Sequence, residues 1–177
     1  MNNLKLPSSI ILAGKPRSGK SHCIKFLLYN FTAKQDLYKR FSYGVVFSKT
    51  AFTNAYSFIP KQWVHSKYVP NALKNLMKIQ KSIRAKGYAP PHAFVVFDDC
   101  LGNNQFKSDL FKDLVRNYRH YNITPILSTQ YINNIETVNR ECVRVMLLYS
   151  NSSVKELLLL YMNHLVKDLI MNINLNY

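Results

Sequence analysis

Short apolar runs alternate along the chain with longer segments in which apolar residues recur every three or four positions. Continuous apolar runs are typical of strands buried on both faces, and a period of about 3.6 residues is typical of helices packed on one face. Strands in alternation with helices indicate an α/β fold with a mostly parallel central sheet flanked by helices. The pattern predicts strands near residues 9–13, 43–47, 93–97, 125–130 and 143–149, a short extended piece in 63–69 and a half-exposed edge strand in the alternating tail 171–177. It predicts helices near residues 20–33, 71–84, 108–121 and 154–166.

The length and composition fit one domain that spans residues 1–177. With 177 residues and 47% hydrophobic content, the chain can bury a sizeable core. Its apolar runs are shorter than the roughly 18 residues that a membrane-spanning helix needs, and the N-terminus lacks the layout of a signal peptide. Three scattered cysteines without C-x-x-C pairing are typical of reduced thiols. We therefore expect a protein without a membrane span, located in a reduced intracellular compartment.

The most specific motif is the run from Gly14 to Ser21, which reads G-x-x-x-x-G-K-S and lies between a predicted strand and a predicted helix. In such a phosphate loop the backbone curls so that its N–H groups point at the phosphates of a nucleoside triphosphate. Lys20 adds a positive charge, and the Ser21 hydroxyl can bind Mg²⁺. An ordinary glycine turn at a helix start is the alternative. The expected nucleotide-binding residues are Gly14, Lys15, Pro16, Arg17, Ser18, Gly19, Lys20, Ser21 and His22.

Two adjacent carboxylates, Asp98 and Asp99, follow a continuously apolar run of the kind that a buried central strand requires. Carboxylates at such a place are costly unless a cation or hydrogen bonds satisfy them. Beside a phosphate loop, Asp98 is expected to hold Mg²⁺ through its water shell together with Ser21. Asp99 is expected to orient the water that attacks the γ-phosphate. The alternative is a strand-end turn closed by an aspartate hydrogen bond.

Gln130 ends the next predicted strand. If that strand lies beside the first, Gln130 faces the gap between the loop and the carboxylates, where it can contact water or the γ-phosphate. Hydrolysis also gains roughly 10³ to 10⁵ in rate from an arginine that a neighbouring subunit supplies. Arg119 is the first candidate, because it has no carboxylate one helical turn away, whereas Arg116 can pair with Asp113. A solvated surface role is the alternative for each. Further candidates are Arg140 and Arg144.

The formal net charge of +15 is concentrated in the half of the chain that carries the loop. Residues 1–90 hold 16 Lys and Arg against one acidic residue, whereas residues 91–177 hold 8 of each sign. A nucleotide needs about two or three cations, so the excess favours a second polyanion, most simply nucleic acid. Solubility and a generally basic proteome are the alternatives. In the predicted helix 71–84 the lysines form a stripe without acidic neighbours, which is either a DNA contact or a plain solvated face. The DNA-binding candidates are Lys74, Lys78 and Lys81.

Three segments, GKPRSGKS, FVVFDD and RHYNITPILSTQ, together resemble the genome-packaging ATPases of large and membrane-containing DNA viruses. The resemblance covers residues 9 to about 150 and points to the poxvirus-type branch of the FtsK–HerA superfamily. It implies a three-layer, additional-strand, RecA/FtsK-like phosphate-loop fold, in which the glutamine strand lies between the loop strand and the acidic strand. With ATP and Mg²⁺ as cofactors, it implies phosphate and Mg²⁺ contacts for Lys20 and Ser21, Mg²⁺ for Asp98, water activation for Asp99 and γ-phosphate sensing for Gln130.

The same resemblance implies a homo-oligomeric ring, pentameric or hexameric, that drives double-stranded DNA into a preformed capsid and meets capsid portal or vertex proteins. It implies that the protein acts in an infected cell at sites of virion assembly. Retention of the protein in the virion is the alternative. Many relatives in the wider superfamily carry glutamate where this chain has Asp99. The chain is also short for the family, so any DNA-gripping part is small or lies in the aromatic and basic stretch 41–68. Core packing is the alternative for those aromatic residues.

Two other functions fit part of the pattern. A small phosphate-loop kinase of a nucleotide or metabolite suits the length, but it has little use for paired acids and needs an arginine-rich lid. A nucleotide-gated, non-catalytic scaffold that binds DNA would also use the loop and the charge. Phosphoryl transfer to an acceptor would favour the kinase, and turnover unchanged by Asp99→Asn would favour the scaffold.

Overall fold

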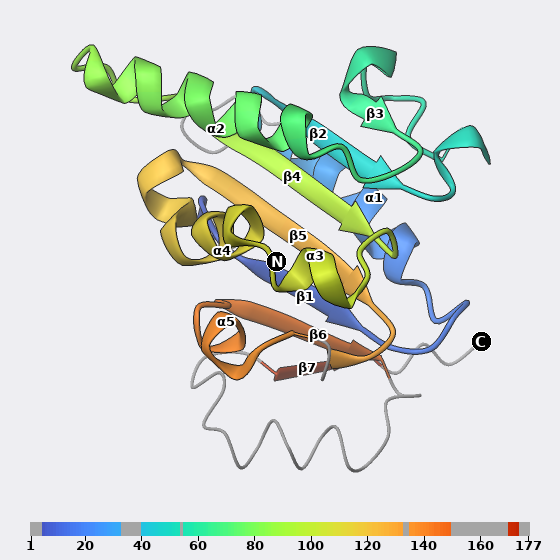
Figure 1. Ribbon diagram of the computed structural model, residues 1–177. Helices are drawn as coiled ribbons and strands as arrows, with labels where there is room; N and C mark the ends of the chain where they lie inside the picture. The colour runs from blue at the N-terminus through green and yellow to red at the C-terminus, as the bar shows by residue number, and fades with distance from the viewer. Residues whose placement is uncertain (1–4, 33–39, 54, 133–134, 150–169, 174–177) are drawn as a thin grey trace.

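A parallel sheet forms the centre of the protein (Figure 1). The computed structural model describes residues 5–32, 40–53, 55–132, 135–149 and 170–173. Within these residues the sheet has seven strands in the order β3-β2-β4-β5-β1-β6-β7, and every neighbouring pair is parallel. The strands are β1 (Ile10–Ala13), β2 (Tyr43–Ser48), β3 (Val64–His65), β4 (Ala93–Asp98), β5 (Ile123–Thr129), β6 (Val145–Tyr149) and β7 (Ile170–Ile173).

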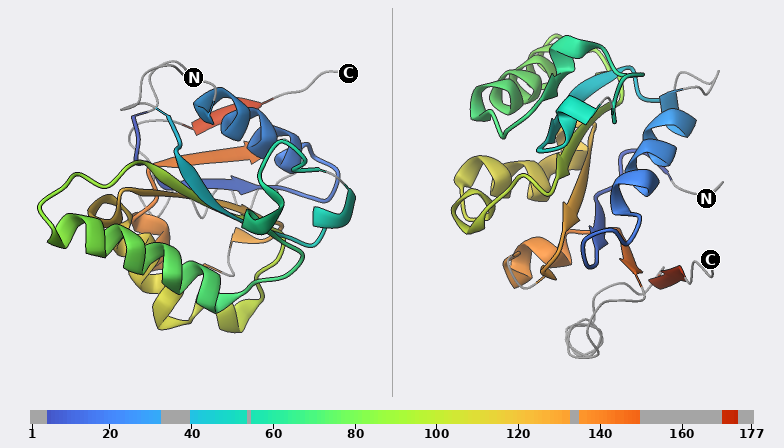
Figure 2. Two further views of the ribbon diagram at one scale, coloured as in Figure 1. Left: turned by 90° about the horizontal axis from the view of Figure 1, so that it is seen from above. Right: turned by 90° about the vertical axis from the view of Figure 1, so that its right-hand side faces the viewer.

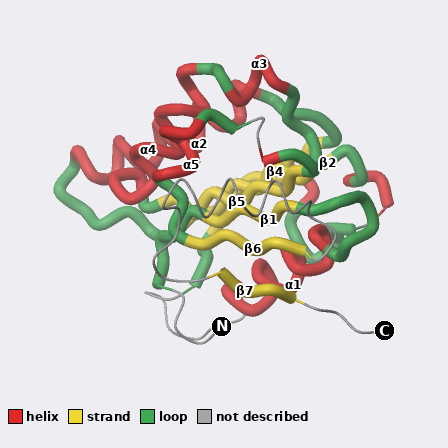
Figure 3. The backbone as a smooth tube through the Cα atoms, turned by 90° about the horizontal axis from the view of Figure 1, so that it is seen from below, coloured by secondary structure: helices red, strands yellow, loops and turns green. Residues whose placement is uncertain are grey.

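Helices cover both faces of the sheet, which confirms the three-layer α/β prediction. One face carries α1, and the other carries α2, α4 and α5, as the side view in Figure 2 and the view from below in Figure 3 show. Each face has its own cluster of buried apolar side chains, because each side of a central parallel strand must be covered. The helices are α1 (Lys20–Thr32), α2 (Pro70–Ala85), α3 (Asn103–Phe106), α4 (Asp109–Tyr121) and α5 (Thr137–Glu141).

Local sequence explains where the main helices begin and end. Helix α2 begins at Pro70, whose fixed φ suits the first helical position. Ser108 caps α4, since its hydroxyl accepts a hydrogen bond from the Phe111 N–H at 3.4 Å. At the other end of α4, Asn122 adopts a left-handed conformation with φ 54° and ends the helix.

The structure corrects the predicted elements at their edges. The extended piece in 63–69 shortens to β3, and a 3₁₀ turn, Lys61–Trp63, precedes it. The strand predicted from residue 143 begins two residues later, after α5, a helix too short for its periodicity to be seen in the sequence. The tail contributes β7 at the sheet edge, paired in parallel with β6. The helix predicted for 154–166 and the last residues of the tail, 174–177, lie outside the described residues.

The position of β5 decides which side chains can meet. It pairs with β1 on one side, with Ala13 beside Thr129, and with β4 on the other, with Asp98 beside Ser128. The strand that leads to Gln130 therefore lies between the loop strand and the acidic strand, as the family resemblance implies. The strands of a parallel sheet all end on the same side. The phosphate loop and the carboxylates therefore lie at one edge of the sheet, the one formed by the carboxyl ends of the strands.

The aromatic residues of 41–68 serve the core for the most part. Phe41, Phe47 and Tyr56 are buried, whereas Phe52 and Phe58 are exposed. Gly44 lies where β2 approaches β4 closely, because a Cβ on it would come within 2.4 Å of the Phe94 carbonyl oxygen. Among the described residues, no helix is long and apolar enough to cross a membrane.

Candidate nucleotide site

The phosphate loop connects the end of β1 to the start of α1, as predicted. The Gly14 N–H donates to the Thr129 carbonyl oxygen at 3.2 Å, which fastens the start of the loop to β5. A Cβ at Gly14 would lie 2.9 Å from the Tyr149 Cβ of β6, so only glycine fits there without a shift. Gly19, with φ 91°, and Arg17, with φ 62°, supply the left-handed backbone that curls the loop.

Lys20 lies inside the loop rather than on the surface, with an exposed fraction of 4%. Its ammonium group donates hydrogen bonds to the carbonyl oxygens of Gly14 at 2.7 Å and Lys15 at 2.8 Å. The same nitrogen lies 3.9 Å from a carboxylate oxygen of Asp99. Burial lowers the pKa of Lys20, and the charges of Asp99 and Asp98 act in the opposite direction. The loop thus holds a cation beside the two acids.

The loop residues fit a bound phosphate chain. The Ser18 hydroxyl oxygen is buried and has no hydrogen-bond partner in the described part of the chain, which is the state expected of a group that bonds a ligand. The start of α1 adds backbone N–H groups and the positive end of the helix dipole. The side chains of Lys15, Arg17 and His22 are exposed around this loop.

Asp98 ends β4 as a buried carboxylate that three hydroxyl groups contact. Ser21 of α1 donates to Oδ1 at 3.1 Å. Ser48 of β2 donates to Oδ2 at 3.2 Å, and Tyr56 donates to the same oxygen at 2.8 Å. Burial, followed by the charge of Asp98, raises the pKa of the Tyr56 phenol, which keeps it a donor.

The pairing of Ser21 with Asp98 suits Mg²⁺. The described residues contain no group of three or more His, Cys, Asp or Glu side chains that could hold a metal ion alone. Mg²⁺ in nucleotide sites needs no such group, because it keeps several waters and takes ligands from the phosphates and from one or two protein oxygens. A hydroxyl and a carboxylate oxygen 3.1 Å apart at the mouth of the loop meet that requirement.

Asp99 turns out of the strand toward the loop. Its backbone has φ 48°, a left-handed conformation that aspartate tolerates better than most residues, and its side chain is half-buried. Burial raises the pKa of the Asp99 carboxyl, and the nearby Lys20 ammonium opposes this shift. A carboxylate so placed can accept a proton or a hydrogen bond from a water above the loop.

Gln130 comes directly after β5, between the ends of β1 and β4. Its side chain is exposed, so it faces solvent at the edge that carries the loop and the acids. Sequence reasoning missed two other residues of this edge, Ser48 and Tyr56. Ser48 had a signal, because it ends an apolar strand as Asp98 does. Tyr56 had none among 12 tyrosines, since it reaches the site only through the fold.

The candidate arginines lie away from the loop of their own chain. Helix α4 ends at Tyr121, just before β5 begins, so its last turn with Arg119 lies at the edge where the strands start. There the Arg119 guanidinium packs 5.4 Å from the Tyr118 ring centre, and its Nε donates to the Tyr118 hydroxyl at 3.0 Å. α5 leads into β6 at the same edge and carries Arg140, which is buried. Arg144, directly before β6, is exposed.

The pairing predicted for Arg116 is wrong. Its Nε donates to Asn139 Oδ1 at 3.3 Å rather than to Asp113. Asp113 accepts instead from Asn117 at 2.7 Å and from the Tyr121 hydroxyl at 2.6 Å, because both face it on the same side of α4.

The lysine stripe of α2 is exposed, as predicted, but one member has a partner from another helix. Lys74 and Lys78 are exposed and make no ion pair within the described ranges. Lys81 lies 4.0 Å from an Asp113 carboxylate oxygen and 5.0 Å from the centre of the Tyr121 ring. The packing of α2 against α4 supplies this partner, so no spacing within α2 could reveal it.

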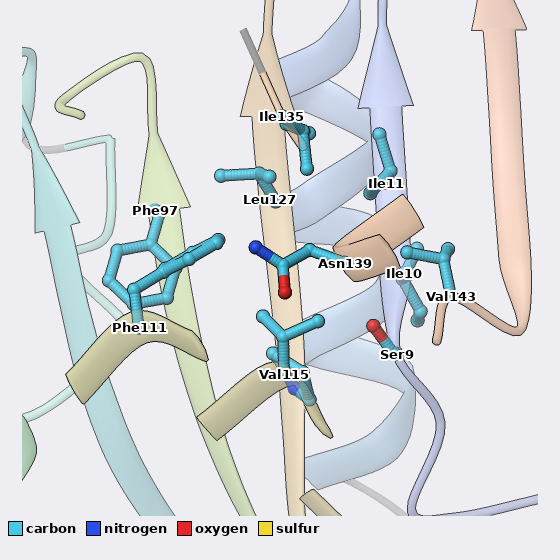
Figure 4. Close-up of a pocket in the computed structure, with 11 residues that line it drawn as sticks. Ser9, Ile10, Ile11, Phe97, Phe111, Val115, Leu127, Ile135, Asn139 and Val143 are labelled. Atoms are coloured by element: carbon cyan, nitrogen blue, oxygen red, sulfur yellow. The ribbon is translucent and has the colours of Figure 1, made fainter. Parts of the chain in front are cut away.

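The cavity in Figure 4 is separate from the phosphate loop. It lies between the sheet and the helices α4 and α5, and its lining is apolar apart from Ser9 and Asn139. Figure 4 shows the Asn139 amide among apolar side chains such as Val115 and Leu127. We interpret it as a gap in the core beneath these helices and not as a phosphate site.

Comparison with known proteins identifies the family. Residues 2–176 match the family described as Poxvirus A32 protein. The chain belongs to this family. Protein 075L of Invertebrate iridescent virus 6 is 28% identical over 153 residues, which are 85% of this chain and 57% of that protein. Protein 015R of Frog virus 3 (isolate Goorha) is 26% identical over 151 residues, 83% of this chain and 45% of that protein. The chain thus spans about half the length of these relatives.

The fold is shared with solved structures of an NTPase and of ATPase domains. The genome packaging NTPase B204 from Sulfolobus turreted icosahedral virus 2, in complex with ATP-γS, superposes with a TM-score of 0.63 at 17% identity over 94% of this chain and 89% of that one. ATPases 2 and 3 of EssC from Geobacillus thermodenitrificans give a TM-score of 0.52 at 15% identity over 76% of this chain and 31% of that one. These likenesses confirm the FtsK-like fold class.

The position of Lys20 leads to a prediction on nucleotide binding. Lys20→Met keeps the length of the side chain and removes the charge, so nucleotide affinity should fall about a hundredfold, as for the loss of charge-assisted hydrogen bonds. Titration with a fluorescent ATP analogue measures this change. Lys25→Met, farther along α1, is the matched control and should bind as the wild type does. Equal affinity of Lys20→Met and the control would contradict the assignment.

Proposed function

We propose that the protein is an ATP-hydrolysing motor that packages double-stranded DNA into a viral capsid. The observation that supports this most is the meeting of three motifs at one edge of the sheet. The loop with Lys20, the acids Asp98 and Asp99, and Gln130 follow the ends of the neighbouring strands β1, β4 and β5. Membership of the Poxvirus A32 protein family and the fold shared with a packaging NTPase support the same proposal.

Each residue has a role in this proposal. The loop from Gly14 to Gly19 and Lys20 bind the phosphates of ATP, while Ser21 and Asp98 hold Mg²⁺, which neutralises phosphate charge when bound. Asp99 orients the attacking water from its place beside Lys20. Gln130 contacts that water or the γ-phosphate. Asp99 and Gln130 thereby favour a hydrolase over a kinase, which must exclude water from its acceptor.

The assembly is part of the proposal. We infer that residues 1–177 form one ATPase domain and that copies join in a homo-oligomeric ring, a pentamer or a hexamer, at a capsid portal or vertex. The work would take place in an infected cell where virions assemble. Arg119 is the proposed trans-acting arginine, with Arg116 as second choice, because the last turn of α4 lies at the sheet edge opposite its own phosphate loop.

DNA should stimulate ATP turnover in a salt-sensitive way. Contacts to phosphates release counterions, so stimulation by double-stranded DNA should be greatest at low salt and fall as salt rises.

Asp99→Asn should lower turnover about a hundredfold or more while nucleotide binding is retained. Phosphate release, measured with and without DNA, tests both statements, and Asp109→Asn at the exposed start of α4 is the control.

Three results would oppose this proposal. Turnover that DNA fails to stimulate at low salt, in an assembled oligomer, would oppose the motor. Turnover unchanged in Asp99→Asn would favour the nucleotide-gated scaffold. Transfer of the γ-phosphate to a nucleoside or metabolite acceptor would favour the kinase.

The lysine stripe of α2 is the proposed DNA contact. Replacing Lys74, Lys78 and Lys81 together by Gln should weaken DNA binding for every sequence and reduce the salt slope by about one unit per lysine. Fluorescence anisotropy of labelled DNA at several salt concentrations measures this slope. Lys5, Lys25 and Lys107 lie on other segments, so the triple replacement of these three by Gln removes the same charge and is the matched control. Equal slopes in the two triple variants would contradict a role for α2.

Mixing of variants tests whether Arg119 acts across the subunit boundary. Arg119→Ala and Asp99→Asn should each lose most turnover alone, the former by about 10³-fold or more. A mixture should recover part of it, because some interfaces then pair an intact Arg119 with an intact Asp99. Arg116→Ala serves as the comparison on the same helix. No recovery in the mixture, or full turnover of Arg119→Ala alone, would exclude Arg119 as this arginine.

A further inference from the structure

The two oxygens of the Asp98 carboxylate have different surroundings. Oδ1 faces Ser21 at the mouth of the phosphate loop, 3.1 Å away. Oδ2 faces into the protein and accepts hydrogen bonds from Ser48 at 3.2 Å and from Tyr56 at 2.8 Å. The carboxylate is thus held from behind by neutral hydroxyl groups, and only its front oxygen lies beside a residue of the loop.

Tyr56 comes from a segment that the motifs of the site do not include. It lies between the 3₁₀ turns Ala51–Thr53 and Lys61–Trp63, in the connection from β2 to β3. Its ring is 2% exposed and belongs to the apolar cluster on the α1 face of the sheet, where Ile59 and Phe94 also lie. Packing therefore fixes the ring and places its hydroxyl within 2.8 Å of Asp98 Oδ2.

Ser48 is oriented in a similar way by its own neighbours. The Thr50 N–H donates to the Ser48 hydroxyl oxygen at 3.2 Å, and the Thr50 hydroxyl lies 3.0 Å from the same oxygen. While its oxygen accepts from the Thr50 N–H, the Ser48 hydroxyl can donate to Asp98 Oδ2. Two preoriented donors on one oxygen restrict the rotation of the carboxylate about its χ angles.

We propose that Tyr56, assisted by Ser48, is a positioning residue that holds Asp98 with Oδ1 toward Ser21, where these two residues would hold the Mg²⁺ of a nucleotide complex. The inference rests on the proposed function only in that Asp98, together with Ser21, must hold Mg²⁺ at the mouth of the phosphate loop. It assigns to the β2–β3 connection a task in nucleotide binding that no phosphate-loop motif indicates. The hydroxyl of Tyr56 acts through Asp98 and touches neither nucleotide nor metal.

Removal of this hydroxyl gives a test that separates positioning from packing. Tyr56→Phe keeps the ring in the core and leaves Oδ2 with Ser48 alone. Outer-shell partners of metal ligands are worth about 10- to 100-fold in metal affinity, so the Mg²⁺ concentration for half-maximal tightening of nucleotide binding should rise about tenfold. The readout is binding of a fluorescent ATP analogue during Mg²⁺ titration, with binding in EDTA as the metal-free reference. Binding in EDTA should not change.

Tyr43→Phe is the matched control. Tyr43 also donates a hydrogen bond from a partly buried phenol, to Gln80 Oε1 at 2.9 Å, but at the opposite end of β2. Its loss should leave the Mg²⁺ titration unchanged. Ser48→Ala removes the second donor from a different element and should shift the titration in the same direction as Tyr56→Phe. If thermal unfolding in EDTA shows that Tyr56→Phe has lost its fold, Ser48→Ala decides the question alone.

The outcomes separate this inference from the proposed function. A Mg²⁺ titration of Tyr56→Phe that matches the wild type would overturn the inference and leave the motor intact. Equal weakening of binding in EDTA and in Mg²⁺ would show a packing role and overturn it too. A wild type whose nucleotide binding does not respond to Mg²⁺ would overturn the metal site together with this inference. DNA stimulation is a separate measurement that none of these results changes.

Discussion

The buried carboxylate of Asp98 is the interaction on which the arrangement of the site depends. A charge at the end of a fully buried strand costs free energy unless hydrogen bonds or a cation satisfy it. Here Ser21, Ser48 and Tyr56 supply hydroxyl donors from α1, from β2 and from the β2–β3 connection. Satisfying one carboxylate therefore joins three segments of the chain around β4. The same bonds place that carboxylate next to the phosphate loop, so the need for stability and the need of the site coincide.

The order of the strands gives this interaction its surroundings. Because β5 lies between β1 and β4, Gln130 follows a strand end that lies between the loop strand and the acidic strand, and the Gly14 N–H can bond to the Thr129 carbonyl. In a parallel sheet, helices must return to the opposite edge before the next strand starts. The last turn of α4 with Arg119 and the short α5 with Arg140 therefore lie at that opposite edge. In the proposed ring, an arginine there would serve a neighbouring copy rather than its own loop.

The charged side chains differ in whether the same chain supplies them with partners. The acids Asp98 and Asp113 are engaged by hydroxyl and amide donors of the same chain. Lys74 and Lys78 stay exposed on α2 without an ion pair in the described part of the chain. A surface that carries such cations, while these acids are already hydrogen-bonded, favours contact with a polyanion. Part of the excess positive charge in the first half of the sequence is therefore exposed on α2, the helix that we propose as the DNA contact.

The class of the fold, the phosphate loop and the paired acids follow from the order of amino acids alone, because they depend on periodicity and on motifs between neighbouring residues. The same periodicity predicts α4 to within a residue of its start at Asp109. Side-chain partners across the fold needed the tertiary structure: Arg116 bonds Asn139, Lys81 meets Asp113, and Tyr56 reaches Asp98. Sequence patterns predict contacts only between residues within one helical turn or one strand of each other. Contacts between residues 42 positions apart, such as Tyr56 and Asp98, exist only once packing has brought their elements together.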